Sequence, residues 1–276
     1  MKPSSCAINL TAAEFQAVLI KAALNGGRSK AEHTAVPVSP DEQATAVVDC
    51  LKAGANAIHL HVRSTSSDWS IHSEKESLNA EDVARTLLTV RSVSPNAPIG
   101  VSTGAWIVPD PKDRLQAVIT WEVLPDFASV NFNEDGAVEL ARLLLSRRVD
   151  VEAGVCDADA AEVFIKSGLA PRCIRVLLEP QEQEMEHALE TVGAIEKVLN
   201  SGTVEIPRIL PRLLHGTEAT AWPMMGEAIT RGYNVRIGLE DTLVLPDGRM
   251  ARDNAELVAE AVRRVRGKQS GEMSTE

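Results

Sequence analysis

The sequence predicts a single α/β domain, a (β/α)8 barrel of the TIM-barrel type, and three observations support this fold class. The chain has 276 residues, which is usual for one such barrel. Eight short runs of β-branched and aliphatic residues alternate with segments of helical periodicity. Hydrophobic residues make up 44% of the chain and aromatic residues only 3%, so we expect a sizeable core built from aliphatic side chains.

The expected strands are bounded by turn signals, and most are followed by a clear helical pattern. We expect strands at 17–24, 57–62, 98–102, 126–132, 149–155, 173–179, 208–214 and 234–240. The clearest helices are expected at 40–53, 80–93, 135–147, 158–168, 183–200, 219–231 and 253–266.

The first of these helices has recognisable signals at both ends. Ser39 is a suitable N-cap, Pro40 occupies the first turn, and Gly54 follows the last helical residue. The chain contains no linker or repeat, so we expect one barrel domain over 1–268 and a flexible tail over 269–276.

An open, doubly wound sheet is the main alternative fold, because it is also built from alternating strands and helices. Its nucleotide-binding version places GxGxxG or GxxxxGK[ST] after the first strand. Neither pattern occurs there, so the sequence favours the closed barrel.

Charge and cysteine content narrow the class of protein. A net charge of -11 argues against a nucleic-acid surface, because no excess of basic residues is available to displace counterions. Four scattered cysteines without CxxC spacing indicate reduced thiols. No apolar run approaches the ~18 residues of a membrane span, and the N-terminus lacks the apolar core of a signal peptide. We therefore expect a cytoplasmic protein.

Two histidines lie one residue apart in the second expected strand. Side chains alternate across a strand, so Ile58, Leu60 and Val62 share one face while His59 and His61 share the other. In a barrel the aliphatic face packs beneath helices, and the histidines then point inward at the C-terminal end, where barrel enzymes keep their active sites.

The last expected strand repeats this alternation. Arg236, Gly238 and Glu240 lie on its inward face, and Asp241 comes just after it. Because the first and last strands of a closed barrel are neighbours, Glu240 could approach the two histidines. Two imidazoles and one carboxylate with an open position are typical of catalytic zinc, and iron or manganese would accept the same ligands. A salt bridge between Glu240 and Arg236 is the alternative.

Polar residues also gather at the C-terminal ends of other expected strands. Each could serve a turn or a helix cap, and their shared position is what indicates a site. They are Arg28 after the first strand, Ser102 and Thr103 after the third, Asn131 and Asn133 at the fourth, Glu152 and Gly154 in the fifth, and His215 after the seventh.

Three of these segments resemble a known family, the β-keto acid cleavage enzymes, which take their name from the 3-keto-5-aminohexanoate cleavage enzyme. The segments are "AGANAIHLHVR" at 53–63, "STGA" at 102–105 and "GYNVRIGLEDTLVLPDGRMARDNAELV" at 232–258. The early "KAALNGG" and "VPVSPDE" are also similar to the opening of the family, and the resemblance covers most of the chain.

The resemblance implies a (β/α)8 barrel that binds a divalent metal, usually zinc, and works as a homo-oligomer, a dimer or a tetramer. The family joins a β-keto acid with acetyl-CoA, its co-substrate, to give acetoacetate and a new CoA thioester. By position in the motifs, the resemblance implies that His59, His61 and Glu240 are metal ligands. It implies that Arg236 and Asp241 form a catalytic pair and that Ser102 and Thr103 contact the substrate carboxylate. It also implies that Asn131 and Glu152 lie in the pocket.

This implied chemistry suits the residue types. A β-keto acid can chelate a metal, which polarises the carbonyl group and stabilises an enolate. Asp241 can remove the α-proton, and Arg236 can orient the Asp241 carboxylate. The carbanion then attacks the thioester, and a retro-Claisen step releases the products without a covalent enzyme intermediate.

The sequence departs from the family in three places. Ser64 stands where the family often has Asp, Ala105 stands where it has Gly, and the segment between "SVNF" and "VDVE" is short. After the first strand the family member that acts on an aminated keto acid carries an acid, whereas Arg28 is the nearest candidate here. Arg28 suggests an anionic or neutral polar substrate rather than an aminated one. Alternatively, Arg28 faces solvent or a CoA phosphate.

Three other functions use similar residues. A metal-dependent hydrolase of the amidohydrolase kind places HxH on the first strand and further histidines on later strands, and the fifth and sixth expected strands here contain none. A metal-dependent aldolase or lyase without CoA could use the same ligand set. A barrel that binds a metabolite for sensing is the non-catalytic alternative, and Asp241 beside Glu240 favours chemistry over sensing.

Overall fold

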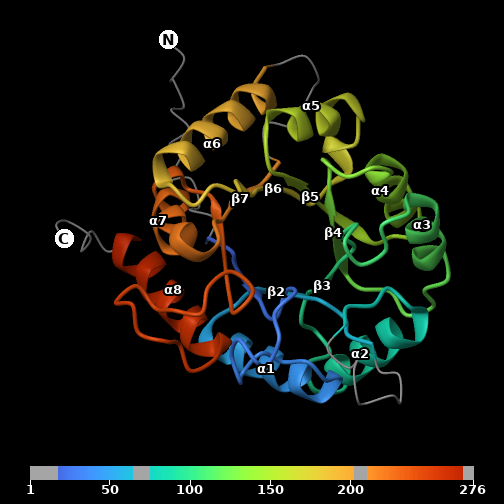
Figure 1. Ribbon diagram of the computed structural model, residues 1–276, viewed down its shortest axis with the longest axis horizontal. Helices are drawn as coiled ribbons and strands as arrows, with labels where there is room; N and C mark the ends of the chain where they lie inside the picture. Colours follow the sequence, from blue (N-terminus) through green and yellow to red (C-terminus); the bar gives the residue numbers. More distant parts are fainter. Residues whose placement is uncertain (1–17, 65–74, 202–209, 270–276) are drawn as a thin grey trace, which may run out of the picture.

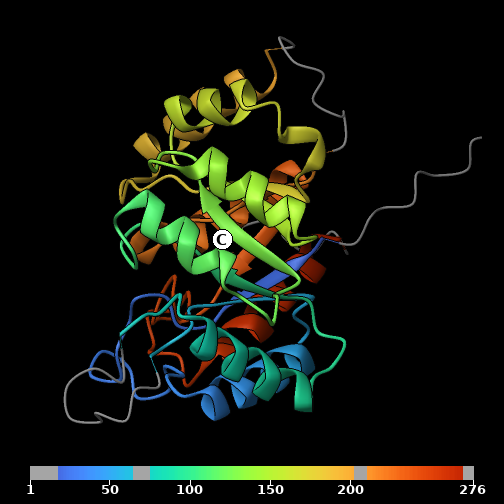
Figure 2. The ribbon, with the colours of Figure 1, turned by 90° about the vertical axis from the view of Figure 1, so that its right-hand side faces the viewer.

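The chain folds into a closed barrel of eight parallel strands, with the strands in sequence order around the ring. The computed structural model describes residues 18–64, 75–201 and 210–269. Figure 1 looks into the ring of strands, with the helices arranged around its outside. Figure 2 shows the same arrangement from the side, with α1 and α2 below the strands and α5 and α6 above them in that view. The predicted fold class is confirmed, and the open sheet is excluded.

Each predicted strand contains an observed one, although the observed ladders are shorter. The strands are β1 Ile20–Ala23, β2 Ala57–Leu60, β3 Ile99–Ser102, β4 Phe127–Asn131, β5 Asp150–Val155, β6 Arg175–Leu178, β7 Arg212–Leu214 and β8 Asn234–Ile237. Predicted strand residues 17, 208 and 209 and tail residues 270–276 lie outside the described residues.

The seven clearest predicted helices are confirmed. The helices are α1 Pro40–Ala53, α2 Ala80–Val93, α3 Pro111–Ile119, α4 Ala137–Ser146, α5 Ala158–Lys166, α6 Met185–Leu199, α7 Ala221–Arg231 and α8 Asn254–Gln269. Helix α3 is short and polar, so its periodicity gives a weak signal, and its start is fixed by Asp110, which accepts hydrogen bonds from the amides of Lys112 and Asp113.

Helix α1 begins and ends as its sequence predicts. The Ser39 side chain accepts from the Glu42 amide, and the Glu42 side chain accepts from the Ser39 amide, which completes a capping box. Gly54 ends the helix in the left-handed region with φ 112°. A Cβ at Gly54 would also lie 2.8 Å from the Val262 side chain of α8, so the glycine allows the two helices to pack closely.

The barrel interior is more polar than the layer beneath the helices. Lys21 Nζ lies 2.6 Å from Glu152 Oε2, and Arg175 Nε lies 3.1 Å from Glu152 Oε1. The guanidinium of Arg175 also lies over the Phe127 ring, 5.4 Å from its centroid. Burial alone would raise the pKa of Glu152, but the Lys21 and Arg175 charges hold it below its ordinary value, so this carboxylate stays ionised.

No helix among residues 18–64, 75–201 and 210–269 is long and apolar enough to cross a membrane. Cys50, Cys156 and Cys173 are free thiols, as the sequence predicts, and Cys6 lies outside the described residues.

The buried Lys21 should make the stability of the barrel depend on pH. Burial lowers the pKa of Lys21 from 10.5 to about 8, although Glu152 opposes this shift. Between these values the unfolded chain holds more protons than the folded protein, so this group makes the free energy of unfolding rise with pH. In urea unfolding, the stability of the wild type relative to Lys21→Met should therefore grow from pH 8 to pH 10. A constant difference between the two proteins would contradict this assignment.

Candidate active site

The two histidines of the HxH motif lie side by side at the C-terminal end of β2. His59 pairs with Ala23 of β1 and Gly100 of β3 in the strand register, and His61 follows directly after the strand. Both residues are buried, with 2% and 3% exposure. Ile58 and Leu60 belong to the hydrophobic layer, whereas the two imidazoles face each other and Glu240. The predicted alternation of faces is therefore confirmed.

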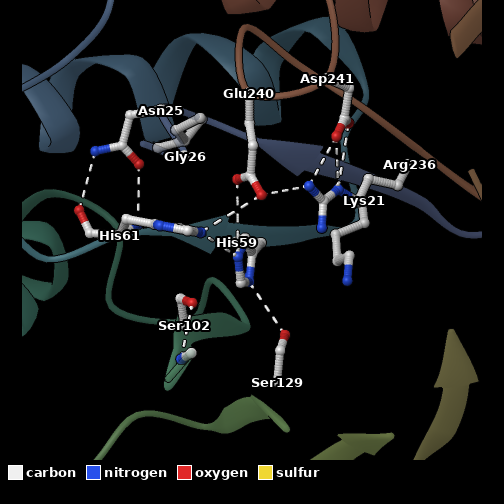
Figure 3. Close-up of polar contacts among 12 residues, drawn as sticks. Lys21, Asn25, Gly26, His59, His61, Ser102, Ser129, Arg236, Glu240 and Asp241 are labelled. Atoms are coloured by element: carbon white, nitrogen blue, oxygen red, sulfur yellow. Dashed lines mark hydrogen bonds and ion pairs between the residues drawn. The ribbon is translucent and has the colours of Figure 1, made fainter. Parts of the chain in front are cut away.

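Glu240 reaches both histidines from the far end of the sequence. Its Oε1 lies 3.4 Å from His61 Nε2, and its Oε2 lies 3.7 Å from His59 Nε2. The two imidazole Nε2 atoms are 3.1 Å apart. Figure 3 shows the three side chains pointing toward one another. Among the described residues, these three form the group of His, Cys, Asp and Glu side chains that could hold a metal ion.

This donor set fits a divalent cation. In a tetrahedral site with bonds of about 2.0–2.1 Å to nitrogen, neighbouring ligand atoms stand about 3.3 Å apart, which is close to the three separations observed. Glu240 Oε2 is buried and has no hydrogen-bond partner within the described part of the chain. A cation held by His59, His61 and Glu240 would satisfy this oxygen and would also explain why two imidazole nitrogens face each other.

Close packing of the first loop positions Glu240. Gly26 has φ +48°, and a Cβ at this residue would lie 2.4 Å from Glu240 Cγ. The β1–α1 loop can therefore pass over the Glu240 side chain only because residue 26 is a glycine.

Glu76 and Trp106 hold the His61 ring from its other side. Glu76 Oε1 contacts His61 Nδ1, and the Trp106 indole N–H donates to Glu76 Oε2 at 2.9 Å. The Trp106 ring also stacks on His61, with centroids 6.0 Å apart and an interplanar angle of 21°. The His61 backbone is fixed by Asn25, which accepts from the His61 amide and donates to its carbonyl oxygen. These contacts leave Nε2 as the ring atom that faces Glu240.

The electrostatic environments of the two imidazoles differ. Burial lowers the pKa of His59 well below its ordinary value of 6.5. Burial would also lower the pKa of His61, but Glu240 and Glu76 outweigh it and raise this pKa to about 9. The Ser129 hydroxyl faces His59 Nδ1 at 3.3 Å and contacts Glu152 at 3.1 Å, which links His59 to the ion pairs of the barrel interior.

Arg236 and Asp241 form a buried pair beside the three ligands. Arg236 Nη2 and Nε lie 2.7 and 3.1 Å from Asp241 Oδ1, and the side chain of Asp241 is fully buried. Arg236 Nη2 also contacts Glu240 Oε1, so the salt bridge considered as an alternative coexists with the ligand arrangement. Burial alone would lower the pKa of Arg236, but Asp241 and Glu240 raise it above its ordinary value, so the guanidinium stays charged.

Ser102 and Thr103 lie at the C-terminal end of β3, at the mouth of the barrel. Figure 3 shows Ser102 on the same side of the site as His59 and Ser129. Both residues are buried, and the Thr103 hydroxyl donates to the Ser129 carbonyl oxygen at 2.6 Å. The adjacent Gly104 allows Trp106 to fold back over this loop, because a Cβ at residue 104 would lie 2.2 Å from the Trp106 ring.

The other candidate residues occupy different depths of the barrel. Asn131 is half-buried at the end of β4, and its amide donates to Glu134 at 2.9 Å. Glu152 lies below the mouth among the interior ion pairs. Arg28 lies at the rim, where its guanidinium contacts Glu218 and Glu32. His215 lies deeper than the rim, with Nδ1 3.8 Å from Asp241 Oδ1.

Comparison with known proteins gives consistent matches. A model of the beta-keto acid cleavage enzyme family matches residues 17–274. The 3-keto-5-aminohexanoate cleavage enzyme of Fusobacterium nucleatum subsp. nucleatum is 27% identical, and the alignment covers 90% of this chain and 91% of that one. The enzyme of the same name from Acetoanaerobium sticklandii is also 27% identical, over 90% of this chain and 92% of that one.

Among solved structures, the ternary complex of ObcA with a C4-CoA adduct and oxalate aligns with a TM-score of 0.65 at 17% identity. The binary complex of ObcA with oxaloacetate aligns with a TM-score of 0.61 at 18% identity. Each alignment covers 85% of this chain, which spans 64% of the ObcA chain. This likeness concerns the fold.

Replacing Glu76 by Ala should weaken cation binding, because the His61 ring loses the carboxylate that fixes its orientation. The loss of such a partner typically costs about 10–100-fold in metal affinity. Titration calorimetry with Zn²⁺ would measure the change. Glu32→Ala removes the same charge at the rim without a contact to either histidine, and it should bind as the wild type does. Equal affinity of the Glu76 variant and the wild type would show that the contact is incidental.

Proposed function

Because the chain belongs to the beta-keto acid cleavage enzyme family, we propose that it joins a β-keto acid with acetyl-CoA. The products are acetoacetate and the CoA thioester of the remaining acyl group. The bond between the keto carbon and the carboxymethyl group breaks, and that carboxymethyl group is transferred to the acetyl carbon. The observation that supports this proposal most is the meeting of His59, His61 and Glu240 with the Arg236–Asp241 pair in one buried mouth.

In the proposed reaction Asp241 takes a proton from the carbon between the two carbonyl groups of the substrate. Arg236 holds the Asp241 carboxylate through two nitrogens, which fixes its orientation. A divalent cation, which we propose is zinc, would supply Lewis-acid polarisation of the keto group when bound by His59, His61 and Glu240. The substrate carbanion then attacks the thioester carbon and displaces the CoA thiolate. The thiolate adds to the keto carbon of the resulting adduct, the bond from that carbon to the carboxymethyl carbon breaks, and the acetoacetate carbanion takes the proton back from Asp241.

The neighbouring residues have supporting roles in this proposal. Ser102 and Thr103 bind the substrate carboxylate. Ser102 donates its hydroxyl hydrogen, and Thr103 donates its backbone N–H, because its hydroxyl hydrogen is already donated to the Ser129 carbonyl oxygen. Asn131 lines the pocket. Glu152 is a positioning residue, because it acts on His59 through Ser129.

We propose that the enzyme works in the cytoplasm as a homo-oligomer of two or four chains. The free thiols of Cys50, Cys156 and Cys173 agree with a reducing compartment. The oligomeric state follows from the resemblance to the family and is measurable by light scattering of the purified protein.

The proposed activity is tested with zinc-loaded protein, a panel of β-keto acids and acetyl-CoA, by measuring acetoacetate. Turnover should require acetyl-CoA. The variant Asp241→Asn, which keeps the size of the side chain, should lower kcat by about 10²–10⁴-fold and still bind the cation. Cleavage that proceeds without acetyl-CoA would favour a lyase. One bound ion per chain without turnover of any keto acid would favour a sensor.

Arg28 should influence which acyl chains are accepted. Its guanidinium has 14% side-chain exposure at the rim, between Glu32 and Glu218. A cation there favours neutral or anionic acyl chains over aminated ones. In Arg28→Glu the ratio of kcat/KM for an aminated keto acid to that for an acidic one should rise about tenfold or more. Glu218→Gln, which removes a partner of Arg28, should shift the ratio in the opposite direction. An unchanged ratio in both variants would remove Arg28 from substrate selection.

A further inference from the structure

A second polar cluster lies across the mouth from the histidines and Glu240. It is formed by residues at or after the C-terminal ends of β4, β5, β6 and β7, which are consecutive strands of the ring. Its members are Asn131, Gly154, Glu179 and His215. The reaction proposed above uses neither Glu179 nor His215.

Two acceptor oxygens converge above Gly154. A Cβ at this residue would lie 2.3 Å from Glu179 Oε1 and 2.8 Å from Asn131 Oδ1, so both oxygens occupy the space that the glycine leaves open. The Asn131 amide nitrogen is already engaged with Glu134, which leaves its oxygen facing Gly154. Two acceptors that face one spot can share a single donor, whereas neither can satisfy the other.

His215 joins this cluster to the catalytic pair. The ring is 4% exposed, and both of its nitrogens are without a hydrogen-bond partner among the described residues. Nε2 stands 3.4 Å from Glu179 Oε2, and Nδ1 stands 3.8 Å from Asp241 Oδ1. Buried ring nitrogens that lie near carboxylates without forming a hydrogen bond can still bind a further polar group. The cluster therefore begins next to the residue that is proposed to take the substrate proton.

Charge decides which donor suits the cluster. The Glu179 side chain is half-buried, and the charge of Arg236 acts on it. The negative charge of Glu179 is thus partly balanced, and a neutral donor can bind without adding a further buried charge. A hydroxyl group also has lone pairs that can accept from the His215 ring, whereas an ammonium group has none.

We propose that Asn131, Glu179 and His215 form a subsite for a hydroxyl group on the acyl chain of the β-keto acid, beyond the keto carbon. The keto acid binds with its carboxylate end toward His59 and Ser102, and its acyl chain runs past Asp241 toward β5 and β6. This inference rests on the proposed function for the orientation of the substrate, and it assigns the substrate class to hydroxylated β-keto acids.

The subsite is tested by binding, which does not depend on turnover. Titration calorimetry on zinc-loaded protein without acetyl-CoA compares three keto acids of equal length, namely 3-oxohexanoate, 6-hydroxy-3-oxohexanoate and 6-amino-3-oxohexanoate. The hydroxylated compound should bind at least about tenfold more tightly than the other two, which corresponds to one or two net hydrogen bonds. Acetoacetate formation, measured separately, reports on the proposed reaction itself.

Two variants test whether this cluster causes the preference for the hydroxylated keto acid. Glu179→Ala removes an acceptor, and Gly154→Ala places a methyl group in the space between the two oxygens, so each should abolish the preference for the hydroxylated compound. Glu186→Gln changes an exposed charge on α6 and should keep the preference. Equal binding of the methyl and hydroxyl compounds by the wild type, tighter binding of the amino compound, or a preference that survives in Glu179→Ala would each overturn the proposal.

Discussion

Closure of the barrel between β1 and β8 is the constraint on which the site depends. Strand β1 pairs with β8 on one side, where Lys21 faces Arg236, and with β2 on the other, where Ala23 faces His59. One strand therefore separates the histidines from Arg236 and Glu240, a span of about 10 Å between backbones. Side chains from opposite ends of the sequence can cover this span only if the ring closes. Gly238 permits the closure, because a Cβ there would lie 1.8 Å from the Ala23 carbonyl oxygen.

A single guanidinium then organises both carboxylates that follow β8. Arg236 contacts Glu240 and Asp241 at once, and its burial keeps water from competing for either of them. Glu240 is thereby turned toward the histidines, while Asp241 is held still as a base must be. The interior ion pair of Lys21 and Glu152 supports His59 through the hydroxyl of Ser129, so the polar interior and the mouth form one connected network.

Strand alternation was sufficient to place His59 and Arg236, because it fixes which face of a barrel strand each side chain occupies. His61 follows the observed end of β2, and Glu240 and Asp241 follow that of β8, but their proximity still follows from the closed ring. Glu76 and Trp106 could not be predicted in the same way, since they come from loops whose course no periodicity describes. Glu179 and His215 each follow a short strand, and a strand pattern does not tell which side chains meet across the mouth. The sequence shows a glycine at residue 154, but it does not show that the side chains of Asn131 and Glu179 lie against this glycine.

If His59, His61 and Glu240 bind one cation together, X-ray absorption spectroscopy of the zinc-loaded protein will detect all three ligands. Combined with metal analysis, it should show one ion per chain, with two imidazole nitrogens at about 2.0–2.1 Å and one carboxylate oxygen in its shell. A zinc shell without imidazole scattering, or an ion content well below one per chain, would contradict this arrangement.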